Sequence, residues 1–427
     1  MLSGVSPTLW INEETARRRA AGTPIVALGF GEAGLPVLPE LAQRLADGAP
    51  RAEYGPVAGI GELREAVAGY WRRRRIDADP GLVIAGPGSK PLLYALVQAI
   101  GGPIALPRPS WVSYAAQAAL AGAPVVAVAA GDEGGVPDPE LLDAAAARAR
   151  DAGAPLRALI LTLPDNPTGT VAGPDTVSAV SEIAERHDLL VICDEIYRDL
   201  VHDPGRPVVS PAELIPERTV VTTRLSKNLA LGGWRLGAAR FPRGARGREL
   251  HGAVLSIASE VWSAPAHPVQ CAAAWAFTEP EPVLERIDAS RRLHGRLARA
   301  IAAVLARHHL ACRAPTAAFY LYPSFAAHRD RLAALSVTDG RGLAAALLDR
   351  HVATLPAAAF GDGEETLSVR VATSGLYGDR DEQRLRALAE PEPAALPWIA
   401  RQLSALDAAL AGLLGERAPA AGDGSPR

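Results

Sequence analysis

Short apolar segments alternate with helix-length segments over roughly residues 80–225 of the chain. A segment that is apolar at nearly every position is typical of a strand buried on both faces of a sheet. Such strands, separated by helices, predict an α/β domain with a doubly wound, mostly parallel sheet. The six segments are LVIAG, PIALP, PVVAVAA, ALILTL, LLVICDE and TVVTTRL.

The pattern changes after about residue 285, where Ala-, Leu- and Arg-rich helical stretches surround the alternating segment LSVRVATS. This change predicts a second, smaller α+β domain. We expect an N-terminal arm and part of the small domain in residues 1–45, the large domain in 46–285, and the small domain in 286–417. Residues 418–427 are rich in Ala, Gly, Pro and Ser, which predicts a disordered tail.

Composition narrows the class of protein. The 427 residues are 48% hydrophobic, enough for a large core, and the formal net charge of -3 predicts no general attraction to nucleic acid or membranes. The three cysteines are far apart and odd in number, so neither a disulfide framework nor a metal site is expected. No basic region followed by an apolar run opens the chain, and no stretch of about twenty residues lacks both charge and proline. We therefore expect a cytoplasmic protein.

One segment is conspicuously basic, the run from Trp71 to Arg75. It ends a stretch in which Leu63, Val67 and Tyr70 recur at helical spacing. Cations are favoured at the negative, C-terminal end of a helix dipole. We interpret this run as a solvated helix end.

Ligands of doubly wound sheets bind beyond the carboxyl ends of the strands, so the residues that follow each predicted strand are informative. After LVIA comes the turn Gly86-Pro87-Gly88-Ser89-Lys90, and then the helical pattern PLLYALVQAI. A glycine turn that opens a helix exposes backbone N–H groups and the positive end of the dipole, which suits a phosphate. A tight turn with a serine cap would explain the same residues.

Two further strand ends carry groups that can hydrogen-bond a ligand. Asn166 lies in PDNPTGT, after ALILTL, where a proline-containing loop can aim its amide into a cleft or simply form a turn. Asp194 and Tyr197 follow LLVIC. A carboxylate at the end of a buried strand needs a partner, because an unpaired buried charge is costly. That partner is either an arginine in a structural ion pair or a protonated heteroaromatic nitrogen.

The fourth informative strand end carries Lys227, just after TVVTTRL. A lysine at this place can be partly desolvated, which lowers its pKa and frees its amine for Schiff-base chemistry. The alternative is an ordinary surface lysine. Arg235 follows eight positions later, after Gly232 and Gly233, where the backbone can come close to a bound group.

One ligand fits all four strand ends. Pyridoxal 5'-phosphate has a phosphate for the glycine turn and Arg235, and an aldehyde for Lys227. Its ring nitrogen suits Asp194, and its phenolic oxygen suits Asn166 and Tyr197. These positions are occupied by the residue types that such a cofactor needs.

The combined motifs resemble the fold-type I pyridoxal-phosphate enzymes, and specifically the class I/II aminotransferases related to aspartate aminotransferase. The likeness runs from about Gly29 to Arg370. The motifs are highly specific together, although each is weak alone. The resemblance implies that Lys227 forms the Schiff base, with Asp194 and Tyr197 as further catalytic residues. It implies cofactor contacts at Tyr54, Gly88, Ser89, Lys90, Trp111, Asn166, Asp194, Tyr197, Lys227 and Arg235, and substrate contacts at Gly31, Asn166 and Arg370.

Three of these roles are implied by other motifs. Trp111 of PSWVSY would stack on the pyridine ring, a role that an indole suits. Tyr54 of YGPVAGIGELREA would reach the phosphate of a neighbouring subunit, which implies a homodimer with shared active sites. Gly31 of LGFGEAGLP would lie beside the substrate carboxylate.

The segment from Gly29 to Gly34 also matches the G-x-G-x-x-G pattern of a dinucleotide-binding turn. A chance match is expected in a chain with 40 glycines. Pro36 and Pro39 follow too closely for the turn to open a regular helix. A nicotinamide dehydrogenase would also need a hydride-transfer site, which the residues around Lys227 do not provide.

Arg370 is the candidate anchor for the substrate carboxylate. Alternation along LSVRVATS puts Ser368, Arg370 and Ala372 on one strand face. An arginine there presents a fork suited to a carboxylate, although a structural ion pair with an acidic neighbour is the alternative. The resemblance implies that Arg370 binds the α-carboxylate.

The sequence departs from the family pattern in two places. Arg224 lies three positions before Lys227, where relatives often have a serine that binds phosphate. Either the phosphate gains a second cation or this arginine turns elsewhere. The C-terminal segment, residues 389–414, is also longer than expected, and we interpret its helix as a surface addition.

We therefore predict a homodimeric aminotransferase that moves an amino group between an L-amino acid and a 2-oxo acid. The alternative keeps the cofactor but eliminates, cyclises or oxidises an amino acid, since these reactions share the same carbanion. A ligand-sensing regulatory module would need a fused DNA-binding domain, for which the residues before Gly29 leave no room. Side-chain specificity stays open, because Tyr54, Trp262 and Tyr320 could each line the substrate pocket or merely pack.

Overall fold

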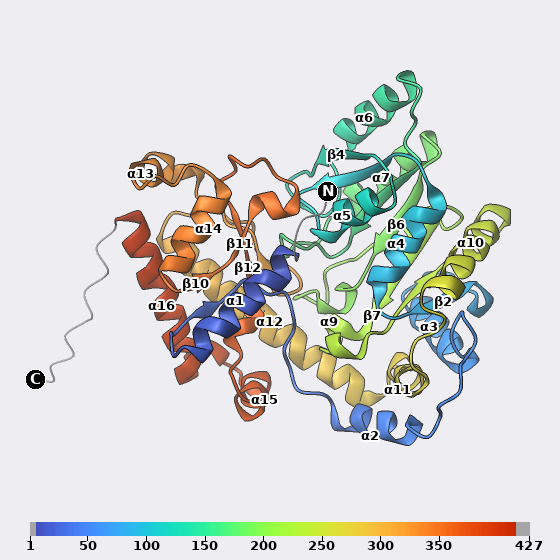
Figure 1. Ribbon diagram of the computed structural model, residues 1–427, viewed down its shortest axis with the longest axis horizontal. Helices are drawn as coiled ribbons and strands as arrows, with labels where there is room; N and C mark the ends of the chain where they lie inside the picture. Colours follow the sequence, from blue (N-terminus) through green and yellow to red (C-terminus); the bar gives the residue numbers. More distant parts are fainter. Residues whose placement is uncertain (1–5, 416–427) are drawn as a thin grey trace, which may run out of the picture.

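A seven-stranded sheet lies at the centre of the larger region of the molecule (Figure 1). The structure, a computed structural model, describes residues 6–415. The strand order is β2-β8-β7-β6-β5-β3-β4, in which β8 runs antiparallel to both neighbours and the other strands run parallel. The strands are β2 (Val83–Gly86), β3 (Ile104–Arg108), β4 (Val125–Ala129), β5 (Ala158–Thr162), β6 (Leu190–Asp194), β7 (Thr219–Arg224) and β8 (Gly237–Arg240).

The predicted α/β fold class is confirmed, and all six predicted segments form strands. The sequence did not predict β8, because its residues are Gly-Ala-Ala-Arg and lack the branched and aromatic side chains that mark strands. Small residues are needed there: a Cβ placed on Gly237 would lie only 2.7 Å from the backbone nitrogen of Ser89. This strand therefore lies directly against the start of a helix.

Helices cover both faces of the large sheet (Figure 1). Alternate strand residues face opposite layers: Ile160 and Ile192 pack with α4, α5 and α10, whereas Leu159 and Val191 pack with α6 and α7. The helices of this region are α2 (Pro39–Gly48), α3 (Gly61–Arg73), α4 (Ser89–Ile100), α5 (Ser113–Leu120), α6 (Pro139–Asp151), α7 (Pro174–Arg186), α8 (Pro211–Leu214), α9 (Leu225–Asn228), α10 (Ala245–Val261) and α11 (His267–Phe277).

The second region combines the N-terminal segment with residues that follow the long helix α12 (Glu281–Arg307). Its strands form a three-stranded antiparallel sheet, β11-β12-β9, and a parallel pair, β1-β10. The strands are β1 (Val26–Ala27), β9 (Tyr320–Leu321), β10 (Val352–Ala353), β11 (Leu355–Pro356) and β12 (Val369–Ala372). The helices are α1 (Pro7–Ala20), α13 (Arg329–Ala334), α14 (Gly340–Asp349), α15 (Asp381–Ala389) and α16 (Pro397–Leu414).

The C-terminal helix corrects one interpretation. Helix α16 is not a surface addition, because Leu406, Leu410 and Leu413 are buried in the same hydrophobic cluster as α12 and β12. Apolar residues at this spacing cover one face of the helix, which packs on the core. No helix among residues 6–415 is long and apolar enough to cross a membrane. The predicted disordered tail lies outside the described residues.

The basic run at the end of α3 corrects a second interpretation. Arg72, Arg73 and Arg75 are exposed, as expected for a helix end, but Arg74 turns inward. Its guanidinium donates to Asp199 at 2.6 Å, pairs with Glu279 and lies 3.6 Å from the centre of the Tyr70 ring.

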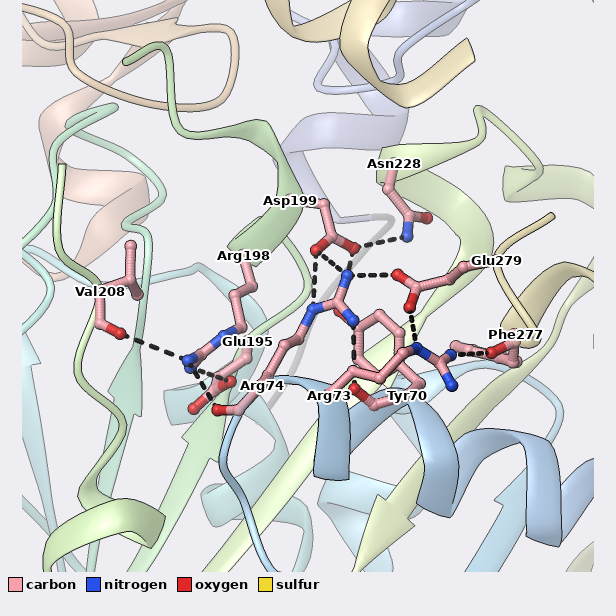
Figure 2. Close-up of polar contacts among 10 residues, drawn as sticks. All are labelled: Tyr70, Arg73, Arg74, Glu195, Arg198, Asp199, Val208, Asn228, Phe277 and Glu279. Carbon is pink, nitrogen blue, oxygen red and sulfur yellow. Dashed lines mark hydrogen bonds and ion pairs between the residues drawn. The ribbon is translucent and has the colours of Figure 1, made fainter. Parts of the chain in front are cut away.

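Figure 2 shows Arg74 between these two carboxylates. Tyr70 Oη and Asn228 Nδ2 also donate to Asp199, at 2.9 and 3.2 Å. Arg74 is therefore part of a paired structural network, and not part of a solvated charge run.

Candidate active site

Lys227 lies on the short helix α9, which follows directly after β7. Its side chain is partly buried, and its amine donates a hydrogen bond to the carbonyl oxygen of Gly31. Burial lowers the pKa of Lys227 well below its usual value, and the nearby guanidinium groups of Arg224 and Arg370 lower it further. The structure therefore favours a neutral amine, as the position after a buried strand suggested.

Asp194 is the last residue of β6, and its side chain is fully buried. Its carboxylate accepts hydrogen bonds from Thr222 Oγ1 at 2.7 Å and Tyr114 Oη at 3.0 Å. Among residues 6–415 it forms no ion pair with an arginine, whereas the neighbouring Glu195 pairs with Arg198 at 2.8 Å. Burial raises the pKa of Asp194, an effect that Arg224 partly offsets. The carboxylate is thus held in place without a strong cationic partner.

The hydroxyl groups of Tyr197 and Tyr320 lie 2.9 Å apart, and both rings are buried. Tyr320 also donates to the carbonyl oxygen of Gly31 at 3.3 Å. Burial raises the pKa of both tyrosines, so each hydroxyl keeps its proton at neutral pH. Of the three aromatic residues proposed to line the substrate pocket, Tyr320 is therefore the one beside Lys227 and Gly31.

Arg370 lies on β12 and is almost completely buried. Its guanidinium donates to the side-chain oxygen of Asn166 at 3.2 Å and to the carbonyl oxygen of Gly29 at 2.6 Å. Among residues 6–415 Arg370 forms no ion pair with a carboxylate. The alternative of a structural ion pair is therefore wrong. The fork of Arg370 is available for an anion.

The glycine turn leads into α4 as expected. Gly88 is the residue before the helix, with φ of 91°, and no side chain caps the helix. Ser89 is buried and its hydroxyl has no partner within the described chain, so the alternative of a serine cap is wrong. Arg235 approaches the turn closely: a Cβ on Gly88 would lie 2.5 Å from its Nη2 atom. Lys90 lies in the first turn, with its amine 5.4 Å from the centre of the Trp111 ring.

The three remaining aromatic candidates, Trp111, Trp262 and Tyr54, differ in their surroundings and exposure. Trp111 is partly buried, and the Arg224 guanidinium lies 5.6 Å from its ring centre. Trp262 packs on the cluster beneath α10, while the side chain of Tyr54 is 94% exposed. The structure of one chain therefore brings together the predicted residues apart from Tyr54.

The residues present fit pyridoxal 5'-phosphate. A phosphate would find free donors at the start of α4, where the buried hydroxyl of Ser89 has no partner and Lys90 and Arg235 supply positive charge. Asp194 supplies an acceptor for a protonated ring nitrogen, and Trp111 supplies a flat apolar surface. The described chain contains no group of three or more His, Cys, Asp or Glu side chains that could hold a metal ion.

Sequence reasoning missed two residues that support Asp194, namely Thr222 and Tyr114. Thr222 lies opposite Asp194 in the β6–β7 register. That register is a tertiary property, and a threonine within an apolar strand carries no signal by itself. Tyr114 lies in the same PSWVSY motif as Trp111, so the motif could have suggested it.

Comparisons with known proteins give one consistent result. Residues 23–386 match the family described as aminotransferase class I and II. The chain is 30% identical to an aspartate aminotransferase of Bacillus subtilis over 384 residues, covering 86% of this chain and 92% of the relative. It is 33% identical to an aspartate/prephenate aminotransferase of Thermus thermophilus over 326 residues, covering 74% and 80%. The solved structure of Thermus thermophilus aspartate aminotransferase with maleate superposes with a TM-score of 0.78 at 28% identity, covering 93% and 97%.

Proposed function

The chain belongs to the class I and II aminotransferase family, and from this premise we propose that Lys227 is its catalytic lysine. As a member of this family, the protein is a pyridoxal-phosphate-dependent enzyme that moves an amino group between an amino acid and a 2-oxo acid. The observation that carries the proposal is a partly buried amine whose pKa is lowered by burial and by two guanidinium groups. A neutral amine can bind the cofactor's aldehyde carbon and accept a proton.

When bound, the cofactor supplies an electron sink for the negative charge that develops at the substrate Cα. Lys227 Nζ accepts the proton from Cα, as general base. Asp194, held by Thr222 and Tyr114, would accept a hydrogen bond from a protonated ring nitrogen and so favour the protonated ring. Tyr197, which stays protonated, can donate a hydrogen bond from its hydroxyl.

We propose that the substrate α-carboxylate binds to Arg370. Its two terminal nitrogens are buried and point to Asn166 and Gly29, so the fork is already oriented before a ligand arrives. Gly31 lies beside this place, since its carbonyl oxygen accepts hydrogen bonds from Lys227 and Tyr320. Holding the carboxylate in this way orients the Cα–H bond toward the amine.

For the substrate side chain we propose an acidic amino acid. The support comes from the names of the relatives, which are aspartate and aspartate/prephenate aminotransferases, and from the structural neighbour with maleate, a dicarboxylate. We also propose a homodimer, in which the exposed Tyr54 reaches the phosphate of the neighbouring subunit. The three cysteines are free, which is compatible with a reducing compartment such as the cytoplasm.

Borohydride reduction followed by peptide mapping tests the role of Lys227. The chain contains two lysines, Lys90 and Lys227, so the result has only two possible positions. We expect the pyridoxyl group on Lys227 in the natural protein and in the control Lys90→Arg, and no label in Lys227→Arg. Label on Lys90 would overturn the assignment.

The reaction and its substrate are tested together in a half-reaction. An acidic amino acid is added without an acceptor and without oxygen. It is expected to remove the visible absorbance of the lysine-bound cofactor stoichiometrically, and a 2-oxo acid is expected to restore it. Leucine and phenylalanine serve as comparison donors. Release of ammonia instead of amino transfer would contradict the proposed course of the reaction, and a preference for leucine would contradict an acidic substrate.

A further inference from the structure

Arg224, the last residue of β7, is a buried cation to which the protein gives no partner. Its side chain is 7% exposed, and its Nε atom is buried without a hydrogen bond. Within residues 6–415 it forms no ion pair with a carboxylate, and its one close ring contact is with Trp111 at 5.6 Å. Burying an unpaired charge costs several kcal/mol, so such a group is expected to meet a ligand.

Other buried arginines of this chain show what a satisfied guanidinium looks like. Arg240, on the neighbouring strand β8, donates to the carbonyl oxygens of Asp77, Pro216 and Thr219 at 2.7 to 3.0 Å. Its burial is comparable to that of Arg224. The lack of partners for Arg224 is therefore a local feature and not a general property of buried arginines here.

The surroundings of Arg224 are mainly positive. Burial and Arg224 together lower the pKa of Lys90 and of Arg235, and both act in the same direction on Lys227. Arg224 lowers the pKa of the buried Asp194, but the oxygens of that carboxylate already accept hydrogen bonds from Thr222 and Tyr114. The acidic groups that act on Lys227 are Glu32 and Asp194, and within the described residues neither forms an ion pair with Arg224.

The strand register places Arg224 near the start of α4. Arg224 lies opposite Gly237 in the β7–β8 pair. A Cβ on Gly237 would lie 2.7 Å from the Ser89 nitrogen and 2.8 Å from the Gly88 carbonyl carbon. The end of β7 therefore adjoins the helix turn that holds the unpartnered hydroxyl of Ser89 and lies against Arg235.

We propose that Arg224 is a ligand of the cofactor's phosphate and supplies a second guanidinium beside Arg235. This inference rests on the proposed function, because it requires that the cofactor binds at Lys227. A planar guanidinium binds two oxygens of one phosphate, and a dianion balances two of the unpaired cations. The same chemistry would suit the second carboxylate of an acidic substrate, and the register with Gly237 favours the phosphate.

The test compares cofactors with and without a phosphate. Dissociation constants of pyridoxal phosphate and of pyridoxal are measured by absorbance titration of cofactor-free protein, for the natural chain, Arg224→Gln and Arg224→Lys. We expect Arg224→Gln to weaken pyridoxal phosphate binding roughly 10- to 100-fold and pyridoxal binding less than about 2-fold. Arg224→Lys keeps the charge but not the fork, and is expected to recover part of the loss. Arg401→Gln, which removes an exposed cation from α16, is the matched control.

Each other outcome overturns the inference. Equal losses for both cofactors would assign Arg224 to the ring or to folding. An unchanged cofactor affinity with a raised KM for the acidic donor would assign it to the substrate carboxylate. If Arg224→Gln does not fold, Arg224→Lys carries the comparison, with an expected loss of about 3- to 10-fold for pyridoxal phosphate alone.

Failure of the proposed function would look different. The natural protein would then bind neither cofactor, or reduction would not label Lys227. If the natural protein is labelled on Lys227 and the Arg224 variants bind pyridoxal phosphate normally, the inference fails and the proposed function stands.

Discussion

Two groups of charged side chains near the segment from Asp194 to Leu200 differ in how fully the chain pairs them. In one group Asp199 pairs with Arg74, and Glu195 pairs with Arg198 (Figure 2). The other group contains Lys227 and its neighbouring cations, for which the chain provides few partners. We call the first group the paired network, made of Tyr70, Arg74, Glu195, Arg198, Asp199, Asn228 and Glu279. We call the second the open cluster, made of Lys90, Arg224, Lys227, Arg235 and Arg370.

The difference between the two groups separates structural from functional charge. In the paired network each cation meets a carboxylate, so removing one partner leaves a buried charge and lowers stability. In the open cluster the cations repel one another, which costs stability, and an anionic ligand removes that cost. The two groups touch through Asn228, which follows Lys227 and donates to Asp199.

The largest expected effect comes from removing the amine of the open cluster. Lys227→Ala is expected to lower kcat/KM by at least about 10⁴-fold, because both covalent binding and proton transfer are lost. The free energy of unfolding of the cofactor-free protein should not fall and should rise at neutral pH, because the variant no longer gives up on folding the proton that Lys227 binds in the unfolded chain. Arg401→Gln, which removes an exposed cation from α16, is the control. A large loss of stability with retained activity would reverse the roles of the two groups.

The paired network should respond in the opposite way. Asp199→Ala leaves Arg74 buried without one of its carboxylates, so the free energy of unfolding should fall by about 3–5 kcal/mol. The matched control is Asp188→Ala, which also removes an aspartate paired with arginine, and should cost about 0–1 kcal/mol. The side chain of Asp188 is 77% exposed, against 9% for Asp199. Urea unfolding measures the free energy of unfolding of both variants. Equal losses of stability would contradict the expected difference between the buried and the exposed aspartate.

The pH dependence of stability distinguishes the groups without a large change in structure. Burial lowers the pKa of Lys227, so over a window below 10.5 the unfolded chain binds a proton that the folded chain does not. Stability of the cofactor-free protein should therefore rise with pH through that window, by about 1.4 kcal/mol for each unit of pKa difference. Unfolding curves at several alkaline pH values, compared with Lys227→Ala, measure this slope, and an identical slope in both proteins would argue against it.

Asp199 should show its effect in acid. Burial alone would raise the pKa of Asp199, but Arg74 outweighs it, and the pKa lies below the usual value of 3.8. The folded chain then binds fewer protons than the unfolded chain in acid. The stability that the Asp199–Arg74 pair contributes is complete when the pH is above the usual aspartate pKa. It is lost as the pH falls through the lowered pKa of Asp199. An Asp199→Asn variant should lose that part of the acid dependence.

The smallest expected effect concerns a partner from outside the chain. If Tyr54 completes the open cluster of a neighbouring subunit, Tyr54→Phe should weaken pyridoxal phosphate binding by about 3- to 10-fold and leave the stability of the chain nearly unchanged. Mixing Lys227→Ala chains with Tyr54→Phe chains should then yield one site that has both natural residues. Absorbance titration of the mixture measures it. A cofactor affinity equal to that of the Tyr54→Phe parent, after verified subunit exchange, would show that each chain builds its site alone.

The strand ends of the large domain were predictable, because buried strands and the turns that follow them are local patterns. The positions of Lys227, Asp194 and Asn166 after apolar segments were therefore visible in the sequence, as was the glycine turn before α4. Strand β8 was not visible, because its small residues are selected by the helix turn that packs against it. The burial of α16 was also missed, since its apolar face has meaning only beside the core that it covers.

The sequence by itself determined the fold class, the family and the residue types at the strand ends, because periodicity and motif spacing are properties of neighbouring residues. Only the tertiary structure decided which charges are paired. Arg74 meets Asp199 across 125 positions, and Arg370 meets Asn166 across 204. From the sequence, Arg224 could either add a second cation for the phosphate or turn elsewhere. The packing of β7, β8 and α4 leaves it buried without a partner among the described residues. Pairing depends on which distant strands and helices come together, and no local pattern contains that information.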